Sequence, residues 1–183
     1  MIKAIVAIRN PDGAIGHQDA LIHHDKLDMR NFAKVTKEAG VIVMGRKTAE
    51  SLRDPLPDRI NYVISKTDQP KLEEAGFIVI TLKEAEELLE KHAGKESPDL
   101  FIVGGATIYN LFKDLIEFYS VTIFGASGPL QKELMEKPAD AWLKLDFLDP
   151  YHEDFHKWDV LSRTLINPNN KEIVLYEYQR IPG

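Results

Sequence analysis

The sequence predicts an α/β fold with a mixed, mostly parallel central sheet that ends in an antiparallel hairpin and is flanked by about four helices. Three observations support this class. Short apolar runs rich in β-branched residues recur along the chain, as is typical of strands buried on both faces. Segments with helical spacing separate these runs, which indicates parallel pairing. Near the C-terminus, two strand-like segments flank a polar turn cluster, which indicates a hairpin.

Each element follows from one of these patterns. Strands are predicted at residues 4–8, 41–44, 60–65, 77–80, 100–103 and 119–124. Helices are predicted at residues 26–38, 47–52, 83–92 and 107–115. The hairpin comprises residues 160–166 and 172–181, on either side of Asn167-Pro168-Asn169-Asn170. Residues 125–158 show no clean period, and we interpret them as a divergent insertion.

Length and composition exclude several classes of protein. A chain of 183 residues is expected to form a single domain over residues 1–183. The absence of cysteine excludes disulfides and thiolate metal sites. A net charge of −6 disfavours nucleic acid and anionic membranes as partners. The N-terminal run MIKAIVAI is too short to span a bilayer and precedes no cleavage site, so we expect a cytoplasmic protein.

Asp28 is the most informative single residue. With Phe32, Val35 and Ala39 it follows helical spacing on one stripe, which places a carboxylate on the face expected to meet the core. A buried carboxylate is costly and has a raised pKa, which is a property of functional sites. The alternative is a solvated acid at the helix start, where Asp25 and Asp28 would both favour the helix dipole.

Two glycine-containing junctions each follow a strand and open a helix. They are Val103-Gly104-Gly105-Ala106-Thr107 and Val43-Met44-Gly45-Arg46-Lys47-Thr48. Glycines let the backbone approach a phosphate closely, and the two cations of the second junction favour a dinucleotide that carries an additional phosphate. The alternatives are an ordinary strand-to-helix turn and a solvated basic first turn.

His152-Glu153-Asp154-Phe155-His156 matches the H-E-x-x-H pattern of zinc proteases. It lies in the insertion just after Pro150, beside Tyr151 and Trp158, which resemble a packing stripe. A pattern with three fixed letters arises by chance, so we predict no metal.

Taken in order, the motifs resemble the dihydrofolate reductase family, closely up to about residue 123 and loosely beyond it. The stretches that carry the resemblance are Ile5-Val6-Ala7, Ala14-Ile15-Gly16, Asp28-Met29-Arg30-Asn31-Phe32 with Thr36, 43–48, Glu50-Ser51-Leu52, Pro55-Leu56-Pro57-Asp58-Arg59-Ile60-Asn61, Ser65 and 103–109. The resemblance implies a dihydrofolate-reductase-like sheet and an oxidoreductase that passes a hydride from NADPH to 7,8-dihydrofolate. The product, tetrahydrofolate, would supply one-carbon metabolism and thymidylate synthesis.

The resemblance also implies roles for individual residues. Asp28 would grip the pterin and promote its protonation, with Thr122 as hydroxyl support. Arg59 would pair with the glutamate tail of the substrate. The implied substrate-binding residues are Ile5, Val6, Ala7, Met29, Phe32, Leu56, Arg59, Val103 and Tyr109. The implied NADPH-binding residues are Ala7, Ile15, Gly16, Leu21, Gly45, Arg46, Lys47, Thr48, Ser65, Lys66, Val103, Gly104, Gly105, Ala106, Thr107 and Ile108. A cis peptide is implied between Gly104 and Gly105, and we expect a monomer.

Two departures from the family keep alternatives open. Ile22-His23 stands where the family has a Pro-Trp pair, and Gly125 to Leu148 replaces a short acidic loop. One alternative is the pyrimidine reductase of riboflavin synthesis, which shares this fold and cofactor. Another is a cofactor-binding homologue with weakened catalysis, and a zinc protease is the most distant.

Overall fold

The computed structural model describes all 183 residues and divides into two compact units. Unit 1 comprises Met1–Ala4 and Asn31–Glu117, and unit 2 comprises Ile5–Arg30 and Phe118–Gly183. Strand β1 (Ile2–Arg9) and helix α1 (Lys26–Ala39) each contribute residues to both units. Including β1, the eight main strands follow the order β10-β11-β8-β1-β7-β4-β5-β6.

Unit 1 contains the parallel part of the sheet. Its strands after β1 are β7 (Leu100–Ile102), β4 (Val41–Gly45), β5 (Ile60–Ile64) and β6 (Ile78–Ile80), each parallel to the next. Ile42, Val43, Met44 and Val63 are fully buried. The apolar runs in the sequence therefore mark strands covered on both faces, as predicted.

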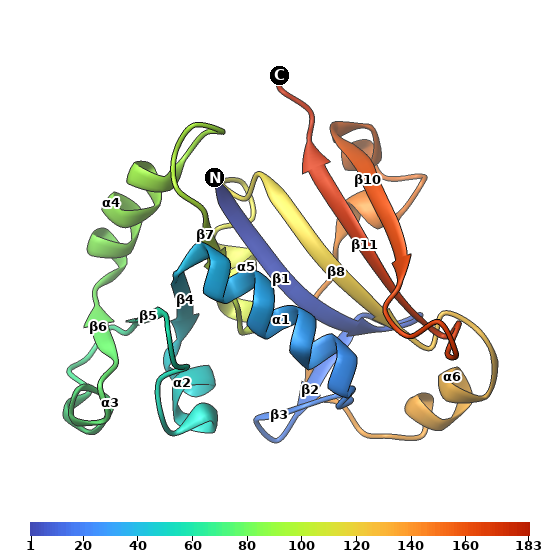
Figure 1. Cartoon of the computed structure of the whole chain (residues 1–183), viewed down its shortest axis with the longest axis horizontal. Coiled ribbons are helices and arrows are strands. Elements are labelled where there is room, and N and C mark those ends of the chain that lie inside the picture. The colour runs from blue at the N-terminus through green and yellow to red at the C-terminus, as the bar shows by residue number, and fades with distance from the viewer. The chain divides into compact units, whose positions relative to one another are not determined.

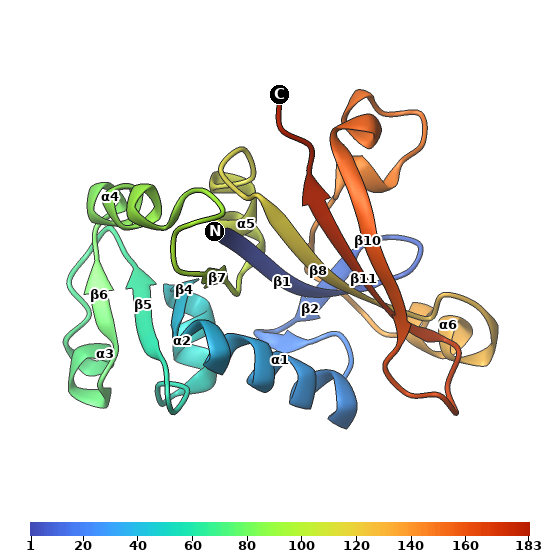
Figure 2. The ribbon, with the colours of Figure 1, turned by 45° about the horizontal axis from the view of Figure 1, so that its top comes forward.

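Short helices connect these strands. They are α2 (Arg46–Leu52), α3 (Pro70–Ala75), α4 (Leu82–His92) and α5 (Ala106–Leu111). Helix α4 begins with a capping box between Thr81 and Glu84, and it buries Ala85 and Leu89. Figure 2 shows α3 and α4 at opposite ends of β6. The sequence did not predict α3, because Leu72 is its one buried residue and a single apolar position shows no helical period.

Unit 2 contains the antiparallel part of the sheet. Strands β8 (Phe118–Phe124), β11 (Ile173–Arg180) and β10 (Trp158–Leu165) lie side by side in Figure 1. β11 pairs antiparallel with both of its neighbours, and its register places Leu175 opposite Thr122. The predicted C-terminal hairpin is confirmed, and Asn167 forms its turn by accepting hydrogen bonds from the backbone of Asn169 and Asn170.

The segment 125–158, interpreted above as an insertion, lies within unit 2. It contains helix α6 (Gly128–Met135), strand β9 (Ala141–Trp142) and the 3-10 helices η1 (Asp146–Leu148) and η2 (Glu153–Lys157). Strand β9 joins β2 (Ala14–His17) and β3 (Ala20–Leu21) in a small second sheet. Leu134 of α6 packs in one apolar cluster with Ala14, Ile22, Phe124 and Ile173.

A buried arginine ties the end of β1 to the insertion. Arg9 is 4% exposed, and its Nη1 donates to the carbonyl oxygens of Leu134 and Lys137 at 2.8 and 2.7 Å. Its Nε donates to Asp12 Oδ1 at 2.9 Å, and Trp142 Nε1 donates to Asp12 Oδ2 at 3.3 Å. The hydrogen bond from Arg9 lowers the pKa of Asp12 to about 2.

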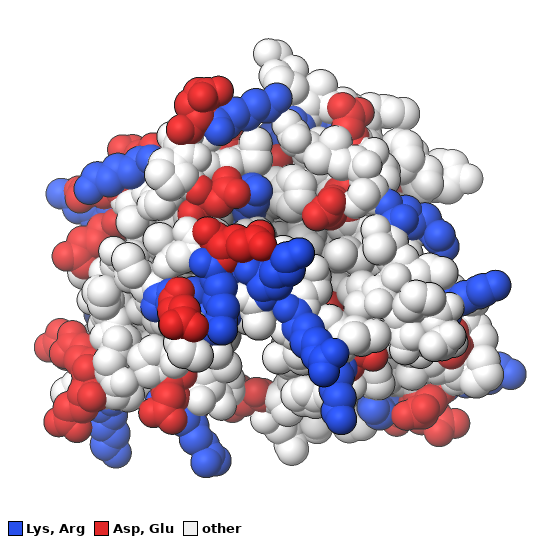
Figure 3. All heavy atoms as spheres, in the orientation of Figure 1, with Lys and Arg blue, Asp and Glu red and all other residues white.

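The predicted fold class is confirmed, with two differences in the helices. There are six α-helices rather than about four, since α3 and α6 join those predicted. The helix predicted to end at residue 115 ends at Leu111 and continues as turns. No helix has the length and apolar character needed to cross a membrane. Figure 3 shows acidic and basic side chains interspersed over the face in view.

Candidate functional site

In unit 2, Asp28 lies beside a threonine on the sheet. Thr122 Oγ1, on β8, donates a 2.6 Å hydrogen bond to Asp28 Oδ1, on the first turn of α1. Thr122 is 3% exposed, and burial of the Asp28 carboxyl raises its pKa, while the hydrogen bond from Thr122 opposes the shift. The result is a half-buried acid with one oxygen held in place.

Asp28 is not the acid that caps α1. Asp25 Oδ1 accepts hydrogen bonds from the backbone N–H groups of Leu27 and Asp28, at 3.0 and 2.8 Å. The capping function therefore belongs to Asp25. The alternative interpretation of Asp28 as a helix-start acid is weakened, because its side chain bonds to the sheet instead of the helix terminus.

The stripe predicted to face the core is only half-buried. Asp28, Phe32, Val35 and Ala39 are all of intermediate exposure, and Thr36 is the one fully buried residue of α1. Spacing predicts which residues share a face, and the structure shows that this face is only partly covered. Asp28 therefore keeps part of its surface exposed.

The other predicted site residues of unit 2 differ in burial. Ile5 and Val6 are 7% exposed, and Ala7 beside them is half-buried on β1. Ile15 and Gly16 lie on β2, and a Cβ at Gly16 would come within 2.6 Å of the carbonyl oxygen of Ala20. Met29 and Leu21 are 42% and 50% exposed, so these two contribute little to the packing of unit 2.

In unit 1, the two glycine junctions meet. Gly45 N donates to Gly104 O at 2.9 Å, since β4 and β7 are neighbours in the sheet. A Cβ at Gly45 would approach Ile108 Cγ1 to 3.0 Å. Gly104 has φ +123°, a conformation that favours glycine, and the Gly104–Gly105 peptide is cis, as the resemblance implied.

Basic and hydroxyl side chains follow the carboxyl ends of the same parallel strands. Arg46, Lys47 and Thr48 follow β4, and Ser65 and Lys66 follow β5. Gly45 and Ile64, the last residues of the two strands, are register partners, so both groups start at one edge of the sheet. Ligands of open α/β sheets bind at this edge. Val103 and the Gly104–Gly105 pair follow β7, the neighbour of β4.

These side chains have different partners. Arg46 Nη1 donates to Glu50 Oε1 at 2.7 Å, an exposed pair one helical turn apart. Lys47, Lys66 and Thr107 are exposed. Ser65 Oγ donates to the carbonyl oxygen of Thr67 at 2.8 Å. Ala106 and Ile108 belong to α5 with Tyr109, which is 3% exposed.

Arg59 is held by a buried threonine. Its Nη1 donates to Thr36 Oγ1 at 2.8 Å, and its Nε donates to Pro57 O at 2.9 Å. Thr36 is fully buried, and its hydroxyl donates to Phe32 O at 2.6 Å. The arginine is therefore oriented by a side chain of α1 and is not a free loop arginine.

Matching the chain to known families decides its identity. The family model of dihydrofolate reductase matches residues 1–133. The chain belongs to the dihydrofolate reductase family. The match ends within α6, ten residues after the point near residue 123 where the resemblance in the sequence becomes loose.

Individual dihydrofolate reductases are similar over different lengths. Dihydrofolate reductase type 9 of Escherichia coli is 27% identical over 173 residues, which cover 92% of this chain and 94% of that protein. The Bacillus subtilis enzyme is 36% identical over 109 residues, 60% of each chain. A solved structure of dihydrofolate reductase from Enterococcus faecalis, complexed with NADP(H) and RAB-propyl, superposes with a TM-score of 0.71 at 21% identity and covers 98% of this chain and 96% of that one.

Sequence reasoning missed a residue that shapes the Arg59 loop of this member of the dihydrofolate reductase family. Asn61 is 3% exposed, and its side chain accepts from Leu56 N and donates to the carbonyl oxygens of Leu56 and Arg59. These bonds close the Pro-Leu-Pro-Asp-Arg loop, in which Asp58 has φ +62°. The available signal was an asparagine just inside a predicted strand, because an amide side chain that is buried there needs hydrogen-bond partners.

The H-E-x-x-H segment does not form the α-helix that a zinc protease requires. Residues Glu153–Lys157 form a 3-10 helix, and His152 Nδ1 caps it by accepting from Asp154 N. Ligand atoms of Asp146, His152 and Asp154 lie within 4.8 Å of one another, so the group could hold a metal ion. Lys144 and Lys157 already pair with the two carboxylates, at 3.2 and 2.6 Å. The prediction of no metal stays a prediction.

Proposed function

We propose that this chain catalyses the reduction of 7,8-dihydrofolate to tetrahydrofolate, in which the bound pterin accepts a hydride from NADPH. The observation that carries the proposal is the Asp28–Thr122 pair: a half-buried acid with a raised pKa, held by a threonine from the sheet. The family membership supplies the reaction class. NADPH is supported by the complex of the E. faecalis relative with NADP(H) and by the residues described above.

Asp28 has the main chemical role in this proposal. Thr122 occupies Oδ1, and we assign the other carboxylate oxygen to the amino group and adjacent nitrogen of the pterin. A carboxylate in partly apolar surroundings interacts strongly with a cation, because the local dielectric is low. Asp28 therefore stabilises the protonated pterin, which is the form that accepts a hydride at the carbon next to its imine nitrogen.

The cofactor would supply the hydride, and unit 1 has residues that fit it. Gly45, Gly104 and Gly105 have no side chains, so their backbone can lie close to a cofactor. At Gly45 there is also no room for a side chain, because a Cβ would crowd Ile108. Arg46, Lys47 and Lys66 provide cations after two neighbouring strands. Arg46 pairs with Glu50, while Lys47 and Lys66 are exposed, and we assign this group of cations to the phosphates of the cofactor, including the additional phosphate that distinguishes NADPH from NADH.

Arg59 would bind the glutamate tail of the substrate. A guanidinium offers two parallel N–H donors that match a carboxylate. Burial lowers the pKa of Arg59, but an arginine stays charged at any physiological pH. Thr36 accepts a hydrogen bond from Arg59 Nη1, and Pro57 accepts one from Arg59 Nε. We assign the remaining N–H donors of the guanidinium to the glutamate tail of the substrate.

The test is a spectrophotometric assay of purified protein with NADPH and dihydrofolate. Oxidation of NADPH that depends on dihydrofolate, with tetrahydrofolate as the product, is the expected result. Oxidation driven instead by the open sugar phosphate of the riboflavin pathway would identify the pyrimidine reductase. Tight NADPH binding without turnover of either substrate would identify a homologue that has lost catalysis. We further propose a cytosolic monomer, which cell fractionation and sedimentation would test.

A further inference from the structure

A cavity of about 280 Å³ lies in unit 2, where β11 ends and β10 begins. Its walls come from η1, η2 and the two strands, and five of the lining side chains are rings: Phe147, Phe155, His156, Trp158 and Tyr178. The volume is just below the ~300–1,000 Å³ typical of pockets for drug-sized ligands. A single ring with a short side chain is therefore the size of guest that it can hold.

The aromatic walls are held in place by one another. Phe147 and Tyr178 are 6% and 8% exposed, and their ring centroids are 5.0 Å apart. Phe147 also stacks on Trp158, with centroids 4.8 Å apart. Because these rings pack together, the cavity is formed before a ligand arrives. An aromatic guest gains energy against such walls in either offset-stacked or edge-to-face geometry.

Strand register assigns the side chains around the cavity to two faces of the hairpin. Trp158 and Arg180 are register partners, and so are Val160 and Tyr178. Because side chains alternate along a strand, these four share one face of β10 and β11. Three of them line the cavity, so Arg180 lies on the cavity side of the hairpin. Asp159, between Trp158 and Val160, belongs to the opposite face, and its carboxylate is directed away from the rings.

The charged group against the aromatic lining is a guanidinium. The Cζ atom of Arg180 lies 4.8 Å from the centroid of the Trp158 ring, a cation–π contact that restrains the arginine beside the cavity. His156 adds a second donor, because an imidazole carries at least one N–H group, and its ring meets that of Phe155 edge-to-face at 5.3 Å. This face of the hairpin therefore favours an anion.

The backbone holds these two donors near each other. Ile181 N donates to Lys157 O at 2.9 Å, so the residues that follow Arg180 and His156 are bonded together. Lys157 Nζ pairs with Asp154 Oδ1 at 2.6 Å, and that carboxylate is therefore already matched by a cation within η2. The donors of Arg180 and His156 thus come from two segments that a hydrogen bond joins.

The mouth of the cavity exposes apolar surface. Phe155 is 38% exposed, Val160 60% and Ile181 40%. Exposed apolar side chains are common singly, but several around one concave site mark a binding surface. A guest that enters here meets apolar surface first and the rings behind it.

We propose that this cavity binds a small aromatic carboxylate, with its ring among Phe147, Phe155 and Trp158 and its carboxylate bonded to Arg180 and His156. A guanidinium offers two parallel N–H donors that match a carboxylate, and stacking on a ring reduces the freedom that it loses on binding. The inference goes beyond the reductase activity, because none of the residues assigned to the reaction lines the cavity.

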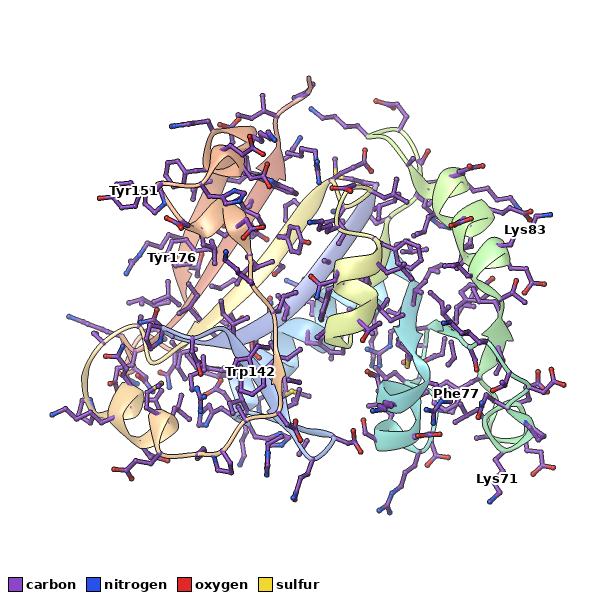
Figure 4. All side chains as sticks on the ribbon, turned by 180° about the vertical axis from the view of Figure 1, so that it is seen from behind. Lys71, Phe77, Lys83, Trp142, Tyr151 and Tyr176 are labelled. Atoms are coloured by element: carbon purple, nitrogen blue, oxygen red, sulfur yellow. The ribbon has the colours of Figure 1, made fainter.

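The experiment follows Trp158 while the probe 3-phenylpropionate is titrated in the absence of dihydrofolate and NADPH. The chain has two tryptophans, so Trp142→Phe leaves Trp158 as the only source of indole fluorescence. Trp142 is 49% exposed, and Figure 4 shows it well away from Tyr151, which lies in the loop between η1 and η2. A saturable change in fluorescence is expected, with chemical-shift changes in the amide NMR spectrum centred on 155–160 and 178–181.

Matched ligands separate the ring from the charge. 3-Phenylpropionamide has the same ring and length without the negative charge, and we expect it to bind about fivefold more weakly. 3-Cyclohexylpropionate keeps the carboxylate without the aromatic ring, and it should bind several-fold more weakly as well.

Matched variants test the guanidinium. Arg180→Gln should remove the preference for the acid over the amide, because glutamine keeps a donor but has no charge, whereas Arg180→Lys should retain part of it. Arg163→Gln is the control, since Arg163 lies over the ring of Tyr176 on the same hairpin and neither residue lines the cavity. This control should bind both ligands as the wild type does.

Four results would overturn the proposal. Equal affinities for the acid and the amide would show an unselective apolar cavity, and an unchanged preference in Arg180→Gln would exclude the guanidinium. Shift changes centred elsewhere would place the site elsewhere, and a lack of saturation would exclude it. Phe155→Leu guards against misfolded variants, because its partly exposed ring can be shortened without opening the core; it should weaken both ligands while the thermal midpoint stays unchanged.

Discussion

Thr122 holds the carboxyl of Asp28 by a hydrogen bond of 2.6 Å from Oγ1 to Oδ1, and it does so from a fully sheet-embedded position opposite Leu175. The hydrogen bond from Thr122 does not neutralise the Asp28 carboxylate, but it fixes the orientation of the carboxyl group. Because Asp25 caps the helix, Asp28 can be changed without removing the helix cap. The pair therefore permits separate tests of catalysis and stability.

Asp28→Asn should abolish most turnover and leave NADPH binding intact. The amide keeps the size of the side chain and can still accept from Thr122, but it cannot stabilise a protonated pterin. Loss of such a group typically lowers the rate by roughly a hundredfold to ten-thousandfold. Steady-state assays would measure the loss, and the wild-type pH profile should show a titration above 3.8, the ordinary pKa of the acid, that is absent from the variant. Wild-type turnover with an unchanged profile would contradict the assignment.

The same substitution should stabilise the protein at neutral pH. Burial raises the pKa of Asp28 in the folded state, so the stability due to its protonated form is complete below the unfolded pKa and is lost as pH rises through the folded pKa. At pH 7 the ionised carboxylate therefore lowers the free energy of unfolding, and asparagine avoids this cost. Thermal melts should show a higher midpoint for the variant at pH 7 and a smaller difference near pH 3. A lower midpoint at pH 7 would count against the buried-acid interpretation.

Asp12→Asn should destabilise the protein at neutral pH but not in strong acid. Arg9 lowers the pKa of Asp12 to about 2, so the stabilisation is complete above the unfolded value of 3.8 and is lost as pH falls through about 2. A pKa lowered this far corresponds to about 2 kcal/mol of stability, and partial exposure of the carboxylate reduces this to about 1 kcal/mol. Urea unfolding at pH 7 and at a pH below 2 would measure it. Asp149→Asn, in the loop after η1, is the control, and equal effects from both variants would refute the prediction.

NADPH should bind more tightly than NADH. The extra phosphate gains charge-assisted hydrogen bonds worth about 1 to 3 kcal/mol, or roughly fivefold to 150-fold in affinity. Lys47→Gln should weaken NADPH binding and leave NADH binding unchanged. Lys71→Gln is a matched control, since Lys71 projects from α3 in Figure 4. Calorimetric titration would show the difference, and equal affinities of the wild type for both cofactors would disprove the phosphate assignment.

The purified protein should contain no stoichiometric zinc. His152 uses Nδ1 to cap η2, and lysines neutralise the two carboxylates nearest to it. Elemental analysis would measure the metal content, and a chelator should leave NADPH oxidation unchanged. Tightly held zinc that disappears in His152→Asn would show that the Asp146, His152 and Asp154 group binds metal after all.

Most of the sheet could be predicted from local patterns in the sequence. The apolar runs identified six strands, and the turn cluster at Asn167 identified the hairpin, because burial on both faces and turn chemistry are recorded in adjacent residues. Strands of two residues such as β3 and β9 have no period to detect, so the small sheet was missed. The boundary of α5 at Leu111 was likewise set by turns that spacing does not show.

The sequence by itself determined which residue types are available: one candidate acid on a helical stripe, two glycine junctions and a set of cations after neighbouring strands. Tertiary structure decided their partners. Only the tertiary arrangement of strands, loops and α1 places Gly45 against Gly104, orients Arg59 on Thr36 and brings Thr122 to Asp28, 94 positions away along the chain. Such pairings depend on contacts between distant segments, and local propensity and periodicity carry no information about them.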